Sequence, residues 1–191
     1  MYVVRSPLYC ALIAATLLIA PSLQAKEAAG HNFADSATVG GQAVGLVGVG
    51  ERTKWMIKVY GMGVYQKTVK KSAAWLIDSD EPKLLWLHMA RGISAEKMRD
   101  AIDEGIDKNT SAADQAAIHA DVERLKAAFP ANIAKDLDIQ FSYAPGTGTT
   151  LRLGNSDKVT VAGKPFMRAL WSIWFGHKPA DGDLKDSVLG K

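Results

Sequence analysis

Two hydrophobic periodicities occupy separate parts of this sequence, and their separation constrains the fold more than any other feature. Residues 43–90 and 137–161 carry the short alternating or continuous apolar runs that are typical of strands. Residues 94–129 and 165–189 repeat apolar positions every three or four residues, as helices do. Parallel βαβ units would interleave the two patterns. The sequence therefore predicts an α+β fold, in which a large antiparallel β-sheet is covered on one face by a layer of helices.

Six strands are expected within these regions. Residues 43–50 hold three glycines, which inside a strand leave room for a ligand or for another backbone. Residues 54–67 alternate charged with apolar or aromatic side chains, with a bend expected at Gly61 and Gly63. Residues 26–41 are small and polar, and we expect them to begin loosely and to pair late. The remaining expected strands are residues 83–90, 137–143, 149–153 and 158–161.

Helix boundaries are marked by capping residues and prolines. Ser94 suits an N-cap position, because its hydroxyl can accept a free backbone N–H of the first turn. Ser111 begins a capping box for the next helix, which Pro130 ends. Two further helices are expected, one from Pro165 to Gly176 and a short one over residues 183–189.

Residues 1–25 have the features of an export signal. Arg5 precedes Leu8–Ala20, an apolar run that is shorter than the roughly 20 residues a membrane-spanning helix needs. We expect cleavage after Ala25, a periplasmic or secreted location, and no stable membrane span after cleavage; an uncleaved anchor is the alternative. Cys10 lies at the start of the apolar run instead of after it, so we do not expect it to be lipidated.

Residues 26–191 are expected to form one domain with a substantial hydrophobic core. The single cysteine of the chain is Cys10, so the expected mature protein of 166 residues (191 minus 25) cannot form a disulfide. A secreted protein without disulfides depends on apolar burial, for which this length is sufficient.

Charge and motifs exclude several classes of function. The chain has 23 basic and 20 acidic residues without a clustered basic face, so no nucleic-acid partner is expected. It lacks a phosphate-binding glycine loop, a dinucleotide fingerprint and a nucleophile elbow. No metal site is expected, because the histidines are far apart in the sequence and lack ligand spacing. They are His31, His88, His119 and His177.

One segment resembles a known family. Gly48-Val49-Gly50-Glu51-Arg52 is followed by Met56–Tyr65, which reads Met-Ile-Lys-Val-Tyr-Gly-Met-Gly-Val-Tyr. This is similar to the chalcone isomerase superfamily, whose segment runs Gly-x-Gly-x-Arg, then a turn between strands, and then an aromatic-Ile-Lys-aromatic strand that ends in Gly-Val-Tyr. Tyr143–Gly146 and Ala169–Gly176 fit the same family in order. The resemblance covers roughly residues 37–189 and is strongest to the secreted bacterial members.

The resemblance implies a cleft between sheet and helices that needs neither cofactor nor metal. In the plant enzymes of the superfamily the cleft holds a chalcone, whose phenolate oxygen adds across an enone. In the fatty-acid-binding relatives it holds an acyl chain. Arg52 matches the arginine that steadies an oxyanion in the enzymes and a carboxylate in the lipid binders, and a guanidinium suits both. Tyr60 matches a tyrosine of the lipid binders, where the isomerases carry threonine.

Two further positions depart from the isomerase pattern. Lys97 stands where the isomerases carry the tyrosine that orders a catalytic water, and Glu104 where an asparagine holds a ring hydroxyl. A buried carboxylate at Glu104 would disfavour an anionic phenolate. Structural roles remain open for all four positions. Arg52 can be an ion-pair partner of Glu51, Tyr60 a sheet tyrosine with a satisfied hydroxyl, and the other two solvated helix residues.

Three functions are consistent with these residues. The leading hypothesis is a periplasmic protein that binds a small hydrophobic carboxylate, a fatty or aromatic acid, without turnover, through Arg52, Tyr60, Lys97 and Glu104. The alternative is an isomerase or lyase of a phenolic enone, in which Arg52 is catalytic and stabilises the oxyanion. The third is a partner-binding protein with a vestigial cleft. Residues expected in the apolar wall of the cleft are Met56, Met62, Trp86, Met98 and Ile102.

Overall fold

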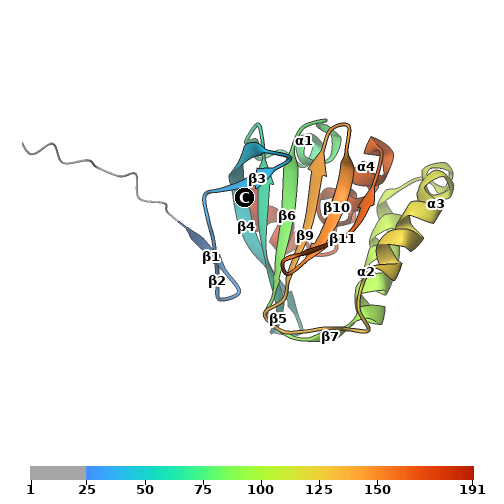
Figure 1. The fold of residues 1–191 in the computed structure, drawn as a ribbon. Helices are drawn as coiled ribbons and strands as arrows, with labels where there is room; N and C mark the ends of the chain where they lie inside the picture. Colours follow the sequence, from blue (N-terminus) through green and yellow to red (C-terminus); the bar gives the residue numbers. More distant parts are fainter. Residues whose placement is uncertain (1–24) are drawn as a thin grey trace, which may run out of the picture.

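Seven strands form one antiparallel sheet in the computed structural model, which describes residues 25–191 (Figure 1). The predicted export signal and Cys10 lie outside the described residues, apart from Ala25, and remain predictions. Every neighbouring pair of strands in this sheet is antiparallel. In sheet order the strands are β11 (Ser156–Val161), β10 (Gly148–Leu153), β9 (Asp138–Ala144), β6 (Lys83–Met89), β5 (Ile57–Gln66), β4 (Gln42–Lys54) and β3 (Ser36–Val39).

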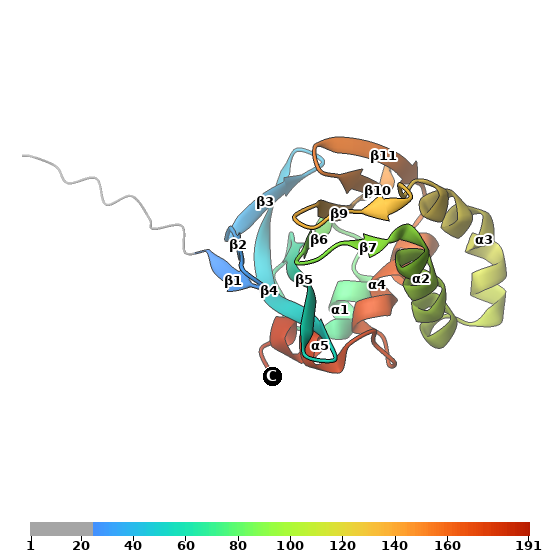
Figure 2. The same ribbon diagram turned by 90° about the horizontal axis from the view of Figure 1, so that it is seen from below.

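Five helices cover one face of this sheet, which curls around them (Figure 2). Their apolar residues join those of β5, β6, β9 and β10 in one core. The predicted α+β class, with an antiparallel sheet and helices, is therefore confirmed. None of the described helices is long and apolar enough to cross a membrane. The helices are α1 (Ala73–Asp78), α2 (Ala95–Asn109), α3 (Ala112–Ala127), α4 (Lys164–Phe175) and α5 (Gly182–Leu189).

The predicted caps define the helix starts. The Ser94 hydroxyl accepts the backbone N–H of Lys97 at 3.4 Å, and α2 begins at the next residue. The Ser111 hydroxyl accepts the backbone N–H of Asp114 at 3.2 Å at the start of α3. Helix α4 ends before Gly176, as the sequence predicts. Sequence reasoning missed α1, a short helix of six residues with a single buried side chain.

The expectation of a loose N-terminal segment is wrong. Residues 26–41 form β1 (Lys26–Ala28), β2 (His31–Phe33) and β3, and β1 and β2 pair as a hairpin. This hairpin lies on the face of the sheet opposite the helices. Phe33 is fully buried there and lies against Gly63 of β5, where an added Cβ would meet the Phe33 ring at 2.5 Å. The large contact area of this one aromatic side chain orders a segment that is otherwise small and polar.

The predicted strand over residues 54–67 begins too early. Lys54 ends β4, and Trp55 and Met56 form the turn to β5. The bend expected at Gly61 and Gly63 is also wrong, because both residues lie within the continuous ladder of β5. Their lack of a side chain serves close packing instead, since a Cβ on Gly61 would lie 2.3 Å from the Ala28 carbonyl oxygen. Two short strands, β7 (Ile93–Ser94) and β8 (Asn132–Ile133), pair beside α2.

Candidate functional site

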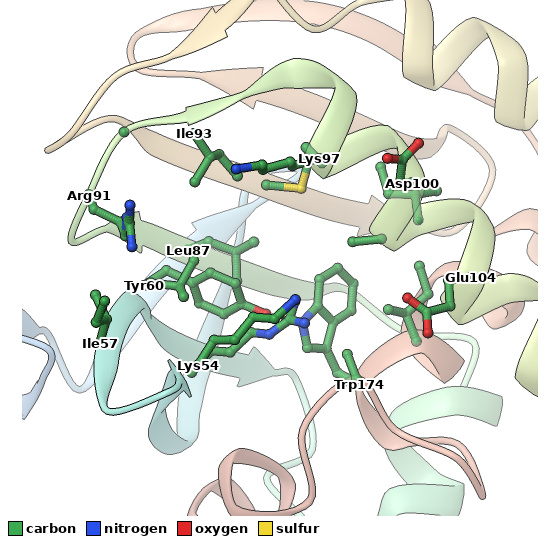
Figure 3. A pocket seen from close by; sticks show the side chains of 18 of the residues that line it. Lys54, Ile57, Tyr60, Leu87, Arg91, Ile93, Lys97, Asp100, Glu104 and Trp174 are labelled. Carbon is green, nitrogen blue, oxygen red and sulfur yellow. The ribbon is translucent and has the colours of Figure 1, made fainter.

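A pocket of about 470 Å³ lies between one end of the sheet and helices α2 and α4 (Figure 3). Strands β4 and β5 line it near their shared turn, and β6 and the connection to β7 line it from the other side. This volume is typical of sites for small ligands. Its charged lining residues are Arg52, Lys54, Arg91, Lys97, Asp100 and Glu104, and its apolar ones include Ile57, Val59, Leu87, Ile93, Met98, Ile102 and Ile173.

Arg52 and Tyr60 are brought together by the register of the β4–β5 ladder. They are direct partners across the two strands, so their side chains lie on the same face of the sheet. The Arg52 guanidinium carbon is 6.0 Å from the centre of the Tyr60 ring. The register shifts by one residue immediately after this pair, which leaves Val59 as an extra residue on β5. Such a bulge turns the strand locally, and here it adds Val59 to the pocket lining.

The ion pair considered between Arg52 and Glu51 does not form. Neighbouring residues of a strand point to opposite faces, and Glu51 points away from the pocket. Its carboxylate lies 2.9 Å from the Lys58 ammonium and accepts the backbone N–H of Ala29 at 3.1 Å. Among the residues that the structure describes, Arg52 has no carboxylate within ion-pair distance. The guanidinium is half-buried and is therefore available to an anionic ligand.

Tyr60 is held as a hydrogen-bond donor by Trp174 of α4. The Trp174 indole Nε1–H donates to the Tyr60 hydroxyl oxygen at 2.8 Å. Because an indole can only donate, Tyr60 accepts this bond and keeps its own proton for a second acceptor. Burial raises the pKa of the Tyr60 hydroxyl, although the nearby Arg52 charge and the Trp174 bond act in the opposite direction. The phenol therefore stays protonated and can donate beside the guanidinium.

Lys97 and Glu104 line the same pocket from α2, so all four predicted site residues meet in one place. Both side chains are exposed at the rim, and Figure 3 shows Glu104 with Asp100 on the α2 side, away from Arg91. Glu104 is not the buried carboxylate that was considered. It pairs with Lys108 one turn along the helix, and this hydrogen bond holds its pKa below the usual value.

The expected apolar wall is only partly placed at the pocket. Met98 and Ile102 line it, whereas Met62 is in the core under the helices and Met56 is almost fully exposed. Trp86 packs on the opposite face of the sheet. The repeat of apolar residues in a strand or helix identifies which residues share a face. It does not identify the part of that face on which no other element packs. For the same reason sequence reasoning missed the pocket residues Leu87, Arg91, Ile173 and Trp174.

Two of the histidines meet in space although they are far apart in the sequence. The rings of His31 and His88 stack at 4.0 Å with 17° between their planes. Their nitrogens and an Asp138 oxygen lie within 4.8 Å of one another, and Asp138 bonds His88 Nδ1 at 2.8 Å. Parallel stacked rings direct their in-plane lone pairs alongside each other instead of toward one point. This cluster lies on the face opposite the pocket, where the two rings pack as an aromatic pair.

Comparisons with known proteins agree with this architecture. No curated protein matches the chain in sequence. The crystal structure of a fatty-acid binding protein from Arabidopsis thaliana has a similar fold, with a TM-score of 0.64 and 17% identity over 84% of this chain and 92% of that one. The chalcone isomerase-like family matches residues 25–190. Because that match spans nearly all of the described residues, the chain belongs to the chalcone isomerase-like family.

Proposed function

We propose that this protein is exported to the periplasm and binds a small hydrophobic carboxylate, a fatty or aromatic acid, in the pocket without turning it over. The observation that carries the proposal is the pair of donors formed by Arg52 and Tyr60 beside the apolar walls of the pocket. A guanidinium and a protonated phenol on one face suit the two oxygens of a carboxylate. The fold shared with a fatty-acid binding protein supports the same ligand class.

The apolar walls would supply most of the binding free energy. Burying a chain of ten methylenes contributes on the order of 8 kcal/mol before the costs of association. Ile57, Val59 and Ile93 line the pocket and keep part of their surface accessible, so they offer such a surface. The charge-assisted bond to Arg52 adds roughly 1.5–3 kcal/mol and fixes the orientation of the ligand. One polar anchor is therefore sufficient for an acid with a long apolar part.

An isomerase of phenolic enones is the second candidate function. The observation that favours it is that Lys97 and Glu104 line the same pocket as Arg52. Ring closure, however, requires a phenolate, and neither Tyr60, which stays protonated, nor Glu104, which is a weak base, is suited to remove the proton of a phenol. The pKa of Tyr60 is raised by burial, and the pKa of Glu104 is lowered by its bond to Lys108. The cavity beside Arg52 is also open, which argues against a vestigial cleft.

Native mass spectrometry of the protein purified from its own envelope, followed by organic extraction, tests the proposal. We expect a fatty or aromatic acid to accompany the wild type and to be lost from Arg52→Ala. Arg91→Ala is the matched control, since it removes the same charge from the same pocket without removing the partner of Tyr60. Retention of the acid by Arg52→Ala, or equal loss from both variants, would contradict the assigned anchor. An empty wild type that converts a phenolic enone would favour the isomerase.

A further inference from the structure

Exposed apolar side chains gather at the turn between β4 and β5. Trp55, Met56 and Ile57 are 88%, 96% and 52% exposed, and we call these three residues the hairpin tip. Within residues 25–191 the one other exposed large hydrophobic residue is Val69, which follows the opposite end of β5. Single exposed apolar residues are common on protein surfaces, whereas a contiguous group points to an interaction.

The backbone conformation of the turn is unfavourable for bulky apolar residues. Lys54 pairs with Ile57, so Trp55 and Met56 form a two-residue turn, and their φ angles are 53° and 64°. Turns with positive φ at both positions favour asparagine, aspartate and glycine, because other side chains are strained there. The exposed side chains of Trp55 and Met56 gain little packing in return. The stability of the fold therefore does not explain why this turn carries bulky apolar residues. Contact with another molecule does explain it.

Basic residues surround the hairpin tip. Lys54 and Lys58 flank it in the sequence, and Arg91 approaches from the connection after β6; all three are exposed. Lys58 is partly balanced by Glu51. The pocket acids lie on the α2 side, away from Arg91 and Ile57 (Figure 3). An indole prefers the interface between lipid and water, and lysine and arginine are attracted to anionic headgroups. The tip with its basic surroundings thus fits the surface of an anionic bilayer.

The hairpin tip also forms part of the pocket lining. Trp55, Ile57 and Lys54 contribute to it directly. We propose that the hairpin tip inserts into the surface of a bilayer containing anionic lipids and places the pocket against the membrane, where the ligand is taken up or released. The exchange of ligand rests on the proposed function, whereas the docking does not.

Vesicle flotation tests the docking. The protein is purified after export, and its N-terminus is determined by mass spectrometry so that all variants carry the same start. The probes are vesicles of phosphatidylcholine with phosphatidylglycerol and vesicles of phosphatidylcholine alone. We expect the wild type to float with the anionic vesicles, to bind neutral ones much more weakly, and to be released as salt is raised.

Two matched variants locate the contact. Met56→Asp places a negative charge on the hairpin tip at a position where aspartate suits the backbone and which does not line the pocket. Val69→Asp places the same charge on the other exposed apolar residue. We expect Met56→Asp to reduce binding to anionic vesicles by at least about tenfold, because an apolar group is lost and a repelled charge gained. Val69→Asp should bind nearly as the wild type does.

A second readout separates docking from ligand binding. Both variants should bind cis-parinaric acid, a fluorescent fatty acid, as the wild type does in solution without vesicles. Failure of the wild type to bind anionic vesicles, equal binding to neutral vesicles, or equal losses in the two variants would overturn the docking. Vesicle binding by a wild type that does not bind the fatty acid would overturn the proposed function and the exchange step while leaving the docking intact.

Discussion

The two ends of the β4–β5 hairpin use opposite kinds of residue. On the side of the Arg52–Tyr60 pair away from the turn, neighbours approach four glycines so closely that none has room for a Cβ: Gly48, Gly50, Gly61 and Gly63. We call these four glycines the hairpin root. Gly48 and Gly50 lie under α5, and the other two lie under the β1–β2 hairpin on the opposite face. At the hairpin tip, the described chain leaves Trp55 and Met56 almost fully exposed and covers only about half of Ile57.

This difference shows that one hairpin serves two purposes. At the root the absence of side chains lets other backbone approach from both faces, so these positions are dictated by folding. At the tip the side chains oppose the backbone preference of the turn and are dictated by contact with something outside the chain. Arg52 and Tyr60 lie between the two, so the closely packed root is on one side of this pair and the exposed tip is on the other.

The largest expected effect is the loss of stability caused by a substitution in the hairpin root. A Cβ on Gly48 would lie 2.1 Å from the Val188 carbonyl oxygen, so α5 must move away from β4. We expect Gly48→Ala to lower the free energy of unfolding by about 3 kcal/mol, measured by urea unfolding. Gly182→Ala is the control within α5, because nothing lies within 4 Å of its added Cβ. Equal stability of Gly48→Ala and the wild type would contradict the packing role of the root.

Substitutions at the hairpin tip should raise stability instead of lowering it. Replacing Trp55 by Asn and Met56 by Gly gives the turn the residues that its positive φ angles favour. We expect this double variant to raise the free energy of unfolding by roughly 1–2 kcal/mol, since two strained residues are relieved and little packing is lost. Thermal and urea unfolding measure the change. A clear loss of stability would mean that the tip packs within the protein and would remove the contrast with the root.

The smallest expected effect is the pH dependence of stability that arises from His31, on the face of the sheet opposite the helices. The pKa of His31 lies below its ordinary value of 6.5, mainly through burial and then through His88, while Asp138 acts in the opposite direction. The folded state therefore binds fewer protons than the unfolded state, so the free energy of unfolding should fall as the pH drops through 6.5. Replacing His31 by Phe should flatten this dependence, and His119→Gln, at an exposed position of α3, is the matched replacement of a histidine outside this cluster. An unaltered slope in the His31 variant would contradict this assignment.

Sequence patterns predicted the features that depend on residues close together in the chain. Ser94 and Ser111 predicted helix starts because capping depends on neighbouring residues alone. Arg52 and Tyr60 were predicted to share a site from a family resemblance, and the strand register explains why they meet. The family resemblance implied a turn after Arg52, but Trp55 and Met56 do not indicate its position, because they lack the glycine or asparagine that such turns favour.

Features that depend on distant contacts were not predictable. His31 and His88 meet because β2 folds back over the sheet, and neither periodicity nor spacing contains that information. The role of Trp174 was missed for a similar reason. Its position on α4 predicts burial, but only the three-dimensional structure shows that it donates to Tyr60 at the pocket.

The central claim is that Arg52 anchors a carboxylate in an apolar pocket. The most direct test measures the affinities of wild type and Arg52→Ala for a fatty acid and for the alcohol of the same chain length by isothermal titration calorimetry. We predict that Arg52→Ala weakens binding of the acid by at least about tenfold, equivalent to loss of one charge-assisted hydrogen bond, and leaves binding of the alcohol nearly unchanged. Equal losses for acid and alcohol, or no loss for the acid, would contradict the account.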